Sequence, residues 1–411
     1  MTDPTASGAL NTIKLAVISN GIAIPGALRA DVHSNNWFQA DTFTAAFALH
    51  AVPEGGPEYW GSDARINMMV DIKVDVGGGP VSLFVGQVDH IDVEMQNGLV
   101  EITGRDLSAR LIERKTQEMF PNQKSFEIAQ TLAARRGLAA DVDATTTFVE
   151  RFYSQDHTKI TGTQFSRTTT EWDLLADLAR HEGFDLWVSG TTLHFKKATG
   201  ISAQPYILNW TPTQLTSGFG RLQANQVIDF RLERTLTLAK DIEVEVRSWH
   251  TRERRAVKGK VRKVRYTTLA DGTKVVKPPA APTVQDVTKI VRGQGGKSAS
   301  AVTSSTQKGT STQRYVFVRP NLSESAALDL AYKLLNEISQ HERNVSFRAP
   351  GNLTLAARTP VRVQGTGSSW DSGGDNPFYS IDSISRSVSF EGGLMVEVRC
   401  KNHPSDSQAI V

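Results

Sequence analysis

The sequence lacks most of the features that would assign it to a specialised class of protein. Its 411 residues contain one cysteine, Cys400, which excludes an internal disulfide framework and any multi-cysteine zinc site. No run of about 18 apolar residues is present, so we expect no transmembrane helix. The first residues also lack a secretory signal. The net charge of +3 is too small to indicate a general nucleic-acid-coating role.

Motifs of common catalytic and cofactor sites are absent as well. The run at 293–298 ends like a phosphate-binding loop, but Val291 stands where that loop needs its first glycine. The histidines show no HExxH spacing, and no Gly-x-Ser-x-Gly elbow occurs. Carboxylates such as Glu113, Glu118 and Asp173 are not placed as a pair across a cleft. We therefore predict that the protein has no catalytic residues, metal or cofactor and is not an enzyme.

What is present is a dense pattern of short strands. The turn pair Asn97-Gly98 between two alternating runs is the strongest short-range signal of a β-hairpin. Alternation at a period of two is typical of strands with one buried face. The strand-like runs of this part are 13–18, 41–49, 66–76, 81–85, 91–95 and 99–102. They predict a first, tube-like β-barrel domain over residues 1–114.

After the first hundred residues the pattern changes to helical spacing. Apolar residues three and four positions apart predict helices over 107–113, 125–136 and 171–183. Asp106 is placed to cap the first of them, and Thr168 with Glu171 has the spacing of a capping box for the third. A hairpin over 184–195 follows. We predict an inserted α+β module over residues 115–205.

The rest of the chain returns to the β pattern. A helix is predicted at about 323–341, with Asn321 and Glu324 near its start. Residues from about 277 to 312 are rich in Pro, Ser, Thr and Gly and predict a flexible arm. The strand-like runs are 227–232, 242–249, 352–355, 361–363, 379–384, 387–390 and 394–400. We assign residues 206–411 to a second β-barrel domain, so the predicted fold is mainly β, with two small tube-type β-barrels and an inserted α+β module.

The most distinctive charge feature is a basic segment at about 247–268, in which only Glu253 opposes the basic residues between Arg247 and Arg265. Three interpretations stay open for it. The segment contacts DNA phosphates, docks to an acidic partner surface, or forms a solvated hairpin whose charges prevent wrong strand pairing. The candidate docking residues are Arg252, Arg254, Arg255, Lys258, Lys260, Arg262, Lys263 and Arg265.

Two stretches carry a resemblance to a known family. The strand Phe84-Val85-Gly86-Gln87-Val88-Asp89, and the strand exit Gly104-Arg105-Asp106-Leu107-Ser108 into a helix, resemble the phage late-control D family of baseplate hub proteins. The helices that follow and the closing runs at 350–351, 359–363 and 379–381 are similar to later pieces of that family. The basic segment and the arm have no counterpart in it.

The resemblance implies a structural hub that forms a homotrimer. Two similar β-barrels in each chain would let three copies form a pseudo-sixfold ring, which joins the sixfold tail tube to the threefold central spike and opens during viral genome ejection. The same architecture is shared with spike proteins of type VI secretion.

The implied partners are other copies of the chain, a separate central spike protein and the tail tube or a tube-initiator protein. The tape-measure protein and the baseplate wedge are further candidates, no membrane span is involved, and DNA passes only in transit. The implied location is the tail baseplate of a virion, after assembly in the host cytoplasm. Two other functions stay open: a tail-associated peptidoglycan hydrolase, and a DNA-binding accessory protein that uses the basic segment.

Overall fold

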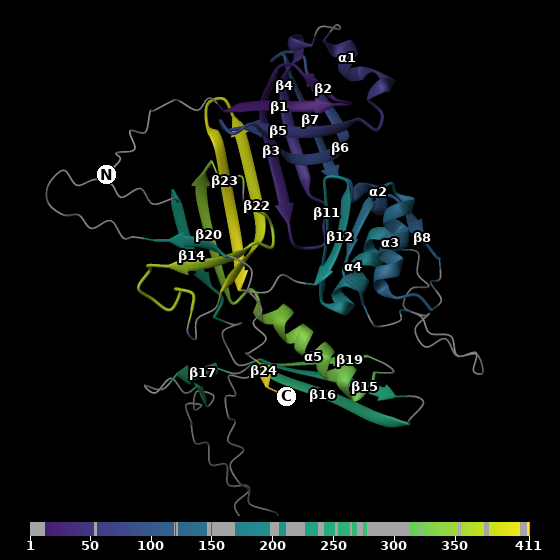
Figure 1. Ribbon diagram of the computed structural model, residues 1–411, viewed down its shortest axis with the longest axis vertical. Coiled ribbons are helices and arrows are strands. Elements are labelled where there is room, and N and C mark those ends of the chain that lie inside the picture. Colours follow the sequence, from purple (N-terminus) through teal and green to yellow (C-terminus); the bar gives the residue numbers. More distant parts are fainter. Residues whose placement is uncertain are drawn as a thin grey trace, which may run out of the picture. The chain divides into compact units, whose positions relative to one another are not determined.

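The computed structural model confirms a mainly β fold with few helices (Figure 1). The chain forms two compact units: unit 1 comprises Met1–Leu232, Val345–Ser372 and Phe378–Lys401, and unit 2 comprises Glu233–Asn344, Gly373–Pro377 and Asn402–Val411. The residues that the structure describes are 13–52, 56–118, 120, 122–145, 149, 169–197, 205–210, 227–236, 242–250, 254–263, 265–268, 274–277, 313–319, 322–351, 353, 355–373, 378–402 and 409–410. Apart from Lys277, the predicted arm at 277–312 lies outside them.

The main feature of unit 1 is a thirteen-stranded sheet. Its central junction joins the two ends of the chain, because β22 pairs antiparallel with β3 from Ser383 opposite Asn35 to Ser389 opposite Arg29. Figure 1 shows these strands side by side. In sheet order the strands are β14 (Asp229–Arg234), β20 (Arg343–Pro350), β23 (Gly393–Asn402), β22 (Tyr379–Ser389), β3 (Ala27–Asn35), β4 (Thr42–Ala48), β7 (Leu99–Asp106), β6 (Pro80–Glu94), β5 (Met69–Asp75), β1 (Lys14–Ser19) and β2 (Ile22–Ile24), while β21 (Pro360–Gln364) joins β22 to β13 (Tyr206–Asn209).

This continuous sheet joins strands from both predicted β-barrel domains. No strand pairing among the described residues closes either β-rich part on itself. The region predicted as the second barrel domain, 206–411, is divided between the units, because β20 to β23 extend the N-terminal sheet whereas the basic segment and its helix form a core of their own. The predicted strand at 352–355 is wrong, since the described Leu353 and Leu355 lie outside any strand.

Two glycines of the family-like motifs lie where β6 and β7 approach closely. A Cβ atom on Gly104 would stand 2.0 Å from the carbonyl oxygen of Gln87 and 2.6 Å from the ring of Phe43. One on Gly86 would stand 2.4 Å from the carbonyl oxygen of Arg105. The predicted runs 81–85 and 91–95 form the single strand β6, whose first half pairs with β5 and whose second half pairs with β7. The glycines permit the close contact at this change of partner.

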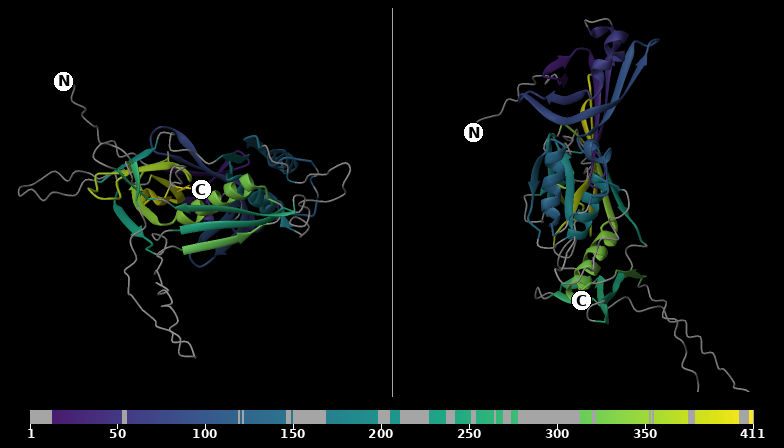
Figure 2. Two further views of the ribbon diagram at one scale, coloured as in Figure 1. Left: turned by 90° about the horizontal axis from the view of Figure 1, so that it is seen from below. Right: turned by 90° about the vertical axis from the view of Figure 1, so that its right-hand side faces the viewer.

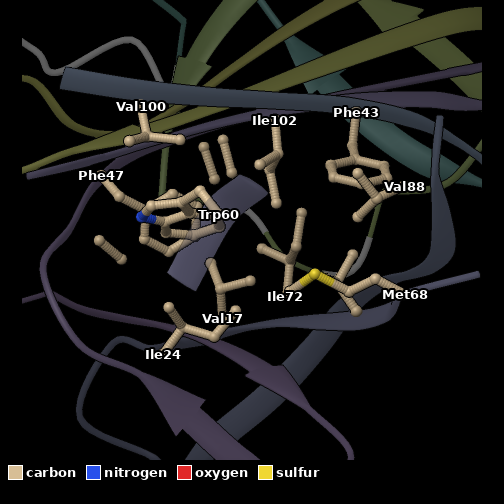
Figure 3. Close-up of a cluster of buried hydrophobic side chains, with 14 of the residues drawn as sticks. Val17, Ile24, Phe43, Phe47, Trp60, Met68, Ile72, Val88, Val100 and Ile102 are labelled. Carbon is tan, nitrogen blue, oxygen red and sulfur yellow. The ribbon is translucent and has the colours of Figure 1, made fainter. Parts of the chain in front are cut away.

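The N-terminal strands enclose a well-packed core (Figure 3). Helix α1 (Pro57–Gly61) contributes Trp60, whose ring centroid lies 5.1 Å from that of Phe47. Val17, Ile72 and Ile102, from three different strands, complete the wall around the two rings and are fully buried. Alternation at a period of two therefore predicted the buried face correctly here.

Helices and strands between residues 109 and 197 share a core of their own. Helices α3 (Ser125–Arg135) and α4 (Glu171–Glu182) pack on the sheet β11 (Phe184–Ser189), β12 (Thr192–Lys197) and β9 (Ala139–Val142). The short α2 (Ala109–Ile112) precedes them, and β8 (Lys115–Thr116) pairs with β10 (Thr169–Thr170). Asp106 ends β7 and accepts the N–H of Ser108 at 3.2 Å.

Unit 2 is a helix packed on a small sheet (Figure 2). The sheet order is β19 (Gln313–Val318), β15 (Ile242–His250), β16 (Arg255–Lys263) and β24 (Ala409–Ile410), and β17 (Arg265–Thr268) pairs with β18 (Lys274–Lys277). The predicted helix is α5 (Glu324–Ser339), which is capped by Ser323, while Asn321 lies outside the described residues. Gly259 lets β16 reach the helix backbone, since a Cβ there would stand 2.4 Å from the carbonyl carbon of Ala327.

Candidate interaction surfaces

Four described basic residues of the basic segment, Arg247, Lys258, Lys260 and Arg262, lie on the face of the unit 2 sheet opposite α5. Ile242, Val244 and Val246 of β15 are fully buried against α5, so the residues between them point to the other side. No described helix covers that side, which we call the open face. It carries Glu243, Glu245, Arg247 and Trp249 of β15, Lys258, Lys260 and Arg262 of β16, and Arg314, Val316 and Val318 of β19.

Two carboxylates oppose the basic residues of the open face. Glu243 pairs with the Nζ of Lys260 at 3.0 Å and with Arg314 at 3.4 Å. Glu245, which is 4% exposed, accepts from the Nε of Arg247 at 2.7 Å and also pairs with Arg314. The sequence-based interpretation named only Glu253 as opposing charge, because it considered neighbours along the chain and not across strands. Positive charge is still in excess, since five basic residues face two acidic ones.

The eight predicted docking residues fall into three groups. Lys258, Lys260 and Arg262 share the open face. Arg254 is exposed in the turn before β16, and Arg255 begins β16 with its guanidinium 3.9 Å from Glu324. The remaining three are Arg252, which lies outside the described residues, and Lys263 and Arg265, whose side chains lie outside them.

Apolar side chains stand beside these charges. Trp249 is 55% exposed, Val316 44% and Val318 73%. A charged surface with an exposed aromatic side chain and aliphatic neighbours is typical of a protein–protein interface. The alternation in β15 predicted Trp249 as part of a strand. Strand β19 was not predicted, so the position of its valines on the same face was not expected.

A second candidate surface consists of the two open edges of the unit 1 sheet. Among the described strands, the sheet order ends at β14 on one side and at β2 on the other. Before that second end, β5 pairs with β6 only as far as Gln87. Residues 89–94 of β6 therefore pair with β7 on one side and with no described strand on the other. Unpaired edges expose backbone N–H and C=O groups, which proteins usually cover or pair with another chain.

Both edge segments have one apolar and one charged face. Phe230 and Leu232 of β14 pack against the core of the C-terminal strands, and Ile91 and Val93 of β6 pack against the N-terminal core. On the opposite faces stand exposed charged residues, which include Asp229 and Arg231 on β14 and Asp92 and Glu94 on β6. Pairing of one edge with the other would therefore continue both faces of the sheet.

Within the part of the chain that the structure describes, no three His, Cys, Asp or Glu side chains come together closely enough to hold a metal ion. None of the helices among those residues is long and apolar enough to cross a membrane.

Comparisons with solved structures identify the fold. A tail protein from Neisseria meningitidis MC58 matches with a TM-score of 0.62 at 15% identity, over 95% of this chain and 96% of that one. The chain has the fold of phage tail proteins. The 43 kDa tail protein of prophage MuSo2 from Shewanella oneidensis matches with a TM-score of 0.56 at 13% identity, over 94% of this chain and 97% of that one.

A more distant match extends the likeness to secretion systems. An Escherichia coli component of the type VI secretion system, described as structurally similar to the T4 tail proteins gp27 and gp5, has a TM-score of 0.50 at 9% identity, over 96% of this chain and 78% of that one. No family model matches the sequence, and no curated protein matches it. The resemblance inferred from the two glycine motifs is thus confirmed at the level of the fold.

Proposed function

We propose that this chain is the structural hub of a phage tail, in which three copies form a ring between the tail tube and a separate central spike. The likeness to phage tail proteins supports a tail role. The observation that carries the ring is the pair of open edges on the unit 1 sheet, β14 and residues 89–94 of β6. Pairing the first edge of each copy with the second edge of the next would cover both of these edges in all three copies.

Each copy contributes eight strands to this ring, from β14 through β22 and β3 to β6. The junction of β22 with β3 already joins two four-stranded halves within one chain. In the ring, the pairing of β14 of one copy with β6 of the next would be equivalent to this β22–β3 junction. Three chains with two such halves each would give six similar positions, which fits a sixfold tube.

The open face of unit 2 is the proposed site for the spike protein. Its excess of positive charge and its exposed Trp249 would suit an acidic protein surface with apolar patches. The tape-measure protein, the baseplate wedge and DNA in transit remain further candidate contacts. A location in the tail baseplate of a virion follows from the proposed role.

Cysteine cross-linking between the two edges tests the ring. Asp92 and Arg231 are exposed and central in their edge segments. Native Cys400 is buried and should not react. We expect the double variant Asp92→Cys, Arg231→Cys to form covalent trimers on oxidation, and the unmodified protein to have a mass of three times 45.0 kDa.

The matched control is the double variant Asp92→Cys, Glu397→Cys, because Glu397 is exposed but its strand, β23, lies between β20 and β22 and not at an edge of the sheet. That variant should give no covalent trimer. A monomeric mass at every concentration, or cross-links that are equal in both double variants, would contradict the ring.

A further inference from the structure

Three polar side chains lie in line on the sheet of the α+β module. The Oγ of Ser189 is 2.8 Å from the Nε2 of His194, and the Nδ1 of His194 is 3.0 Å from the Oδ2 of Asp141. This is the order of a nucleophile, a general base and a carboxylate that orients the base. The sequence showed no such site, because Asp141 and His194 are 53 residues apart and no motif surrounds the serine.

Strand register brings the three residues together. Strand β12 pairs with β11, with His194 opposite Trp187, and with β9, with Asp141 opposite His194. Ser189 is two positions beyond Trp187 and therefore on the same face. The alternate residues of β11 and β12, such as Val188 and Phe195, are buried against the helices. The three functional groups thus share the face that points away from this core.

The imidazole of His194 is held from two sides. The ring of Trp187 stacks on it, with centroids 4.6 Å apart and an interplanar angle of 12°. One carboxylate oxygen of Asp141 accepts a hydrogen bond from the Nδ1 of His194, and the other accepts one from the Nζ of Lys196 at 2.6 Å. These hydrogen bonds, that of Lys196 first, lower the pKa of Asp141. An ionised carboxylate at this position orients the imidazole and stabilises the imidazolium that forms when the base accepts a proton.

Ser189 is exposed and stands on the wall of a cavity of about 400 Å³. Arg358 and Arg386 line the same cavity, and the guanidinium of Arg358 lies 4.3 Å from the ring centroid of Trp187. The Nε atoms of both arginines are buried and have no hydrogen-bond partner among the described residues. Asp41 and Asp106 also line the cavity, but Asp106, whose pKa burial raises to about 8, is protonated at neutral pH, so the two arginines leave positive charge in excess. A buried donor without a partner is costly, so the cavity favours a ligand that accepts hydrogen bonds and carries negative charge.

We propose that Ser189, His194 and Asp141 form an acyl-transfer site for small carboxylic esters whose acid part carries a negative charge. The Ser189 oxygen attacks the ester carbonyl carbon while His194 takes the hydroxyl proton. The bond to the alcohol then breaks, and His194 returns the proton to the leaving oxygen. Water, activated by the same histidine, cleaves the acyl-serine, so one ester and one water give one acid and one alcohol. This activity is separate from the proposed hub role and does not depend on it.

A fluorophosphonate probe, which modifies activated serines, tests the nucleophile. Mass spectrometry of the full-length protein should find the label on Ser189. Ser189→Ala should remove it, and His194→Gln should slow labelling about 100-fold or more. Ser82→Ala is the matched control, because Ser82 is also exposed and donates a hydrogen bond to a carboxylate, that of Asp71 at 2.6 Å, but forms none with a histidine among the described residues. It should label like the unmodified protein.

Two 4-nitrophenyl esters test the substrate class. The succinyl ester, which carries a free carboxylate, should be hydrolysed at least about tenfold faster than the acetyl ester, and Arg386→Gln should remove this preference. Absence of label on Ser189, or labelling that His194→Gln leaves unchanged, would show that the three residues are only hydrogen-bonded neighbours on a sheet and would overturn the site. Equal rates for the two esters would overturn the role of the arginines. Melting curves of each variant identify any loss of fold.

Discussion

At the scale of single residues, unit 1 concentrates buried charge around Arg358. Asp41, Asp106 and Asp185 lie close enough to Arg358 to interact with it electrostatically. Burial raises the pKa of Asp41 and of Asp185, and burial together with the charge of Asp41 raises the pKa of Asp106 to about 8. Arg386 also interacts with Asp41, and Lys401 with Asp185, so Asp106 is the carboxyl group that we expect to keep its proton at neutral pH.

This cluster predicts that stability decreases as pH rises. An unfolded aspartate loses its proton near pH 3.9, whereas folded Asp106 keeps its proton up to about pH 8. The stabilisation is therefore complete below pH 4 and is lost as pH rises through 8. The variant Asp106→Asn keeps a side-chain oxygen that can accept the N–H of Ser108, but it has no titratable proton. Urea unfolding between pH 5 and 8 should therefore show a clearly smaller decrease in the free energy of unfolding for the variant than for the unmodified protein.

Glu118→Gln serves as the control for this experiment. Glu118 is exposed, and its hydrogen bonds to Arg135 lower its pKa, so its own contribution has the opposite sign. If Asp106→Asn and the unmodified protein lost stability equally over this pH range, the proton assigned to Asp106 would be ruled out.

At the scale of elements, helix positions were predicted well but their caps were not. Apolar spacing placed α4 within a residue of its observed end, because the stripe that packs on the sheet sets the helix length. The cap depends on local backbone geometry. The Oγ1 of Thr170 accepts the N–H of Asp173 at 3.0 Å, and the Asp173 carboxylate accepts the N–H of Thr170 at 3.4 Å. The predicted partner Thr168 lies outside the described residues, and Glu171 instead pairs with Arg136 at 2.5 Å.

Removing this cap should weaken α4. Thr170→Ala removes the hydroxyl that accepts the N–H of Asp173, and we expect a loss of about 1 kcal/mol in the free energy of unfolding. Thr170→Ser keeps the hydroxyl and should cost only a few tenths of that. Guanidinium denaturation of both variants measures the difference. Equal losses would mean that the methyl group, and not the hydrogen bond, stabilises the helix start.

At the scale of the whole molecule, alternation along the chain identified most strands but not their partners. A period of two shows which face of a strand is buried, but it does not predict which strands pair with each other. Ser389 and Arg29, for example, pair although they are hundreds of positions apart. The single sheet that joins both chain ends could not be predicted for this reason. The open face could not be predicted for the same reason, because β15 and β16 come from the region of the basic segment whereas β19 follows the predicted arm.

The open face gives the last prediction, which concerns assembly with a spike protein. Lys258 is exposed and stands opposite Arg247 in the strand ladder, so Lys258→Glu reverses charge at the basic part of this face. We expect affinity for a purified candidate spike protein to decrease about tenfold or more, with a loss that shrinks as salt increases. Lys14→Glu is the matched control, because it makes the same change in net charge on β1 of unit 1 and is also exposed. The opposite result would be unchanged spike binding in Lys258→Glu, together with a loss of salt-sensitive binding to duplex DNA that Lys14→Glu does not show. That result would assign the open face to phosphate contacts instead.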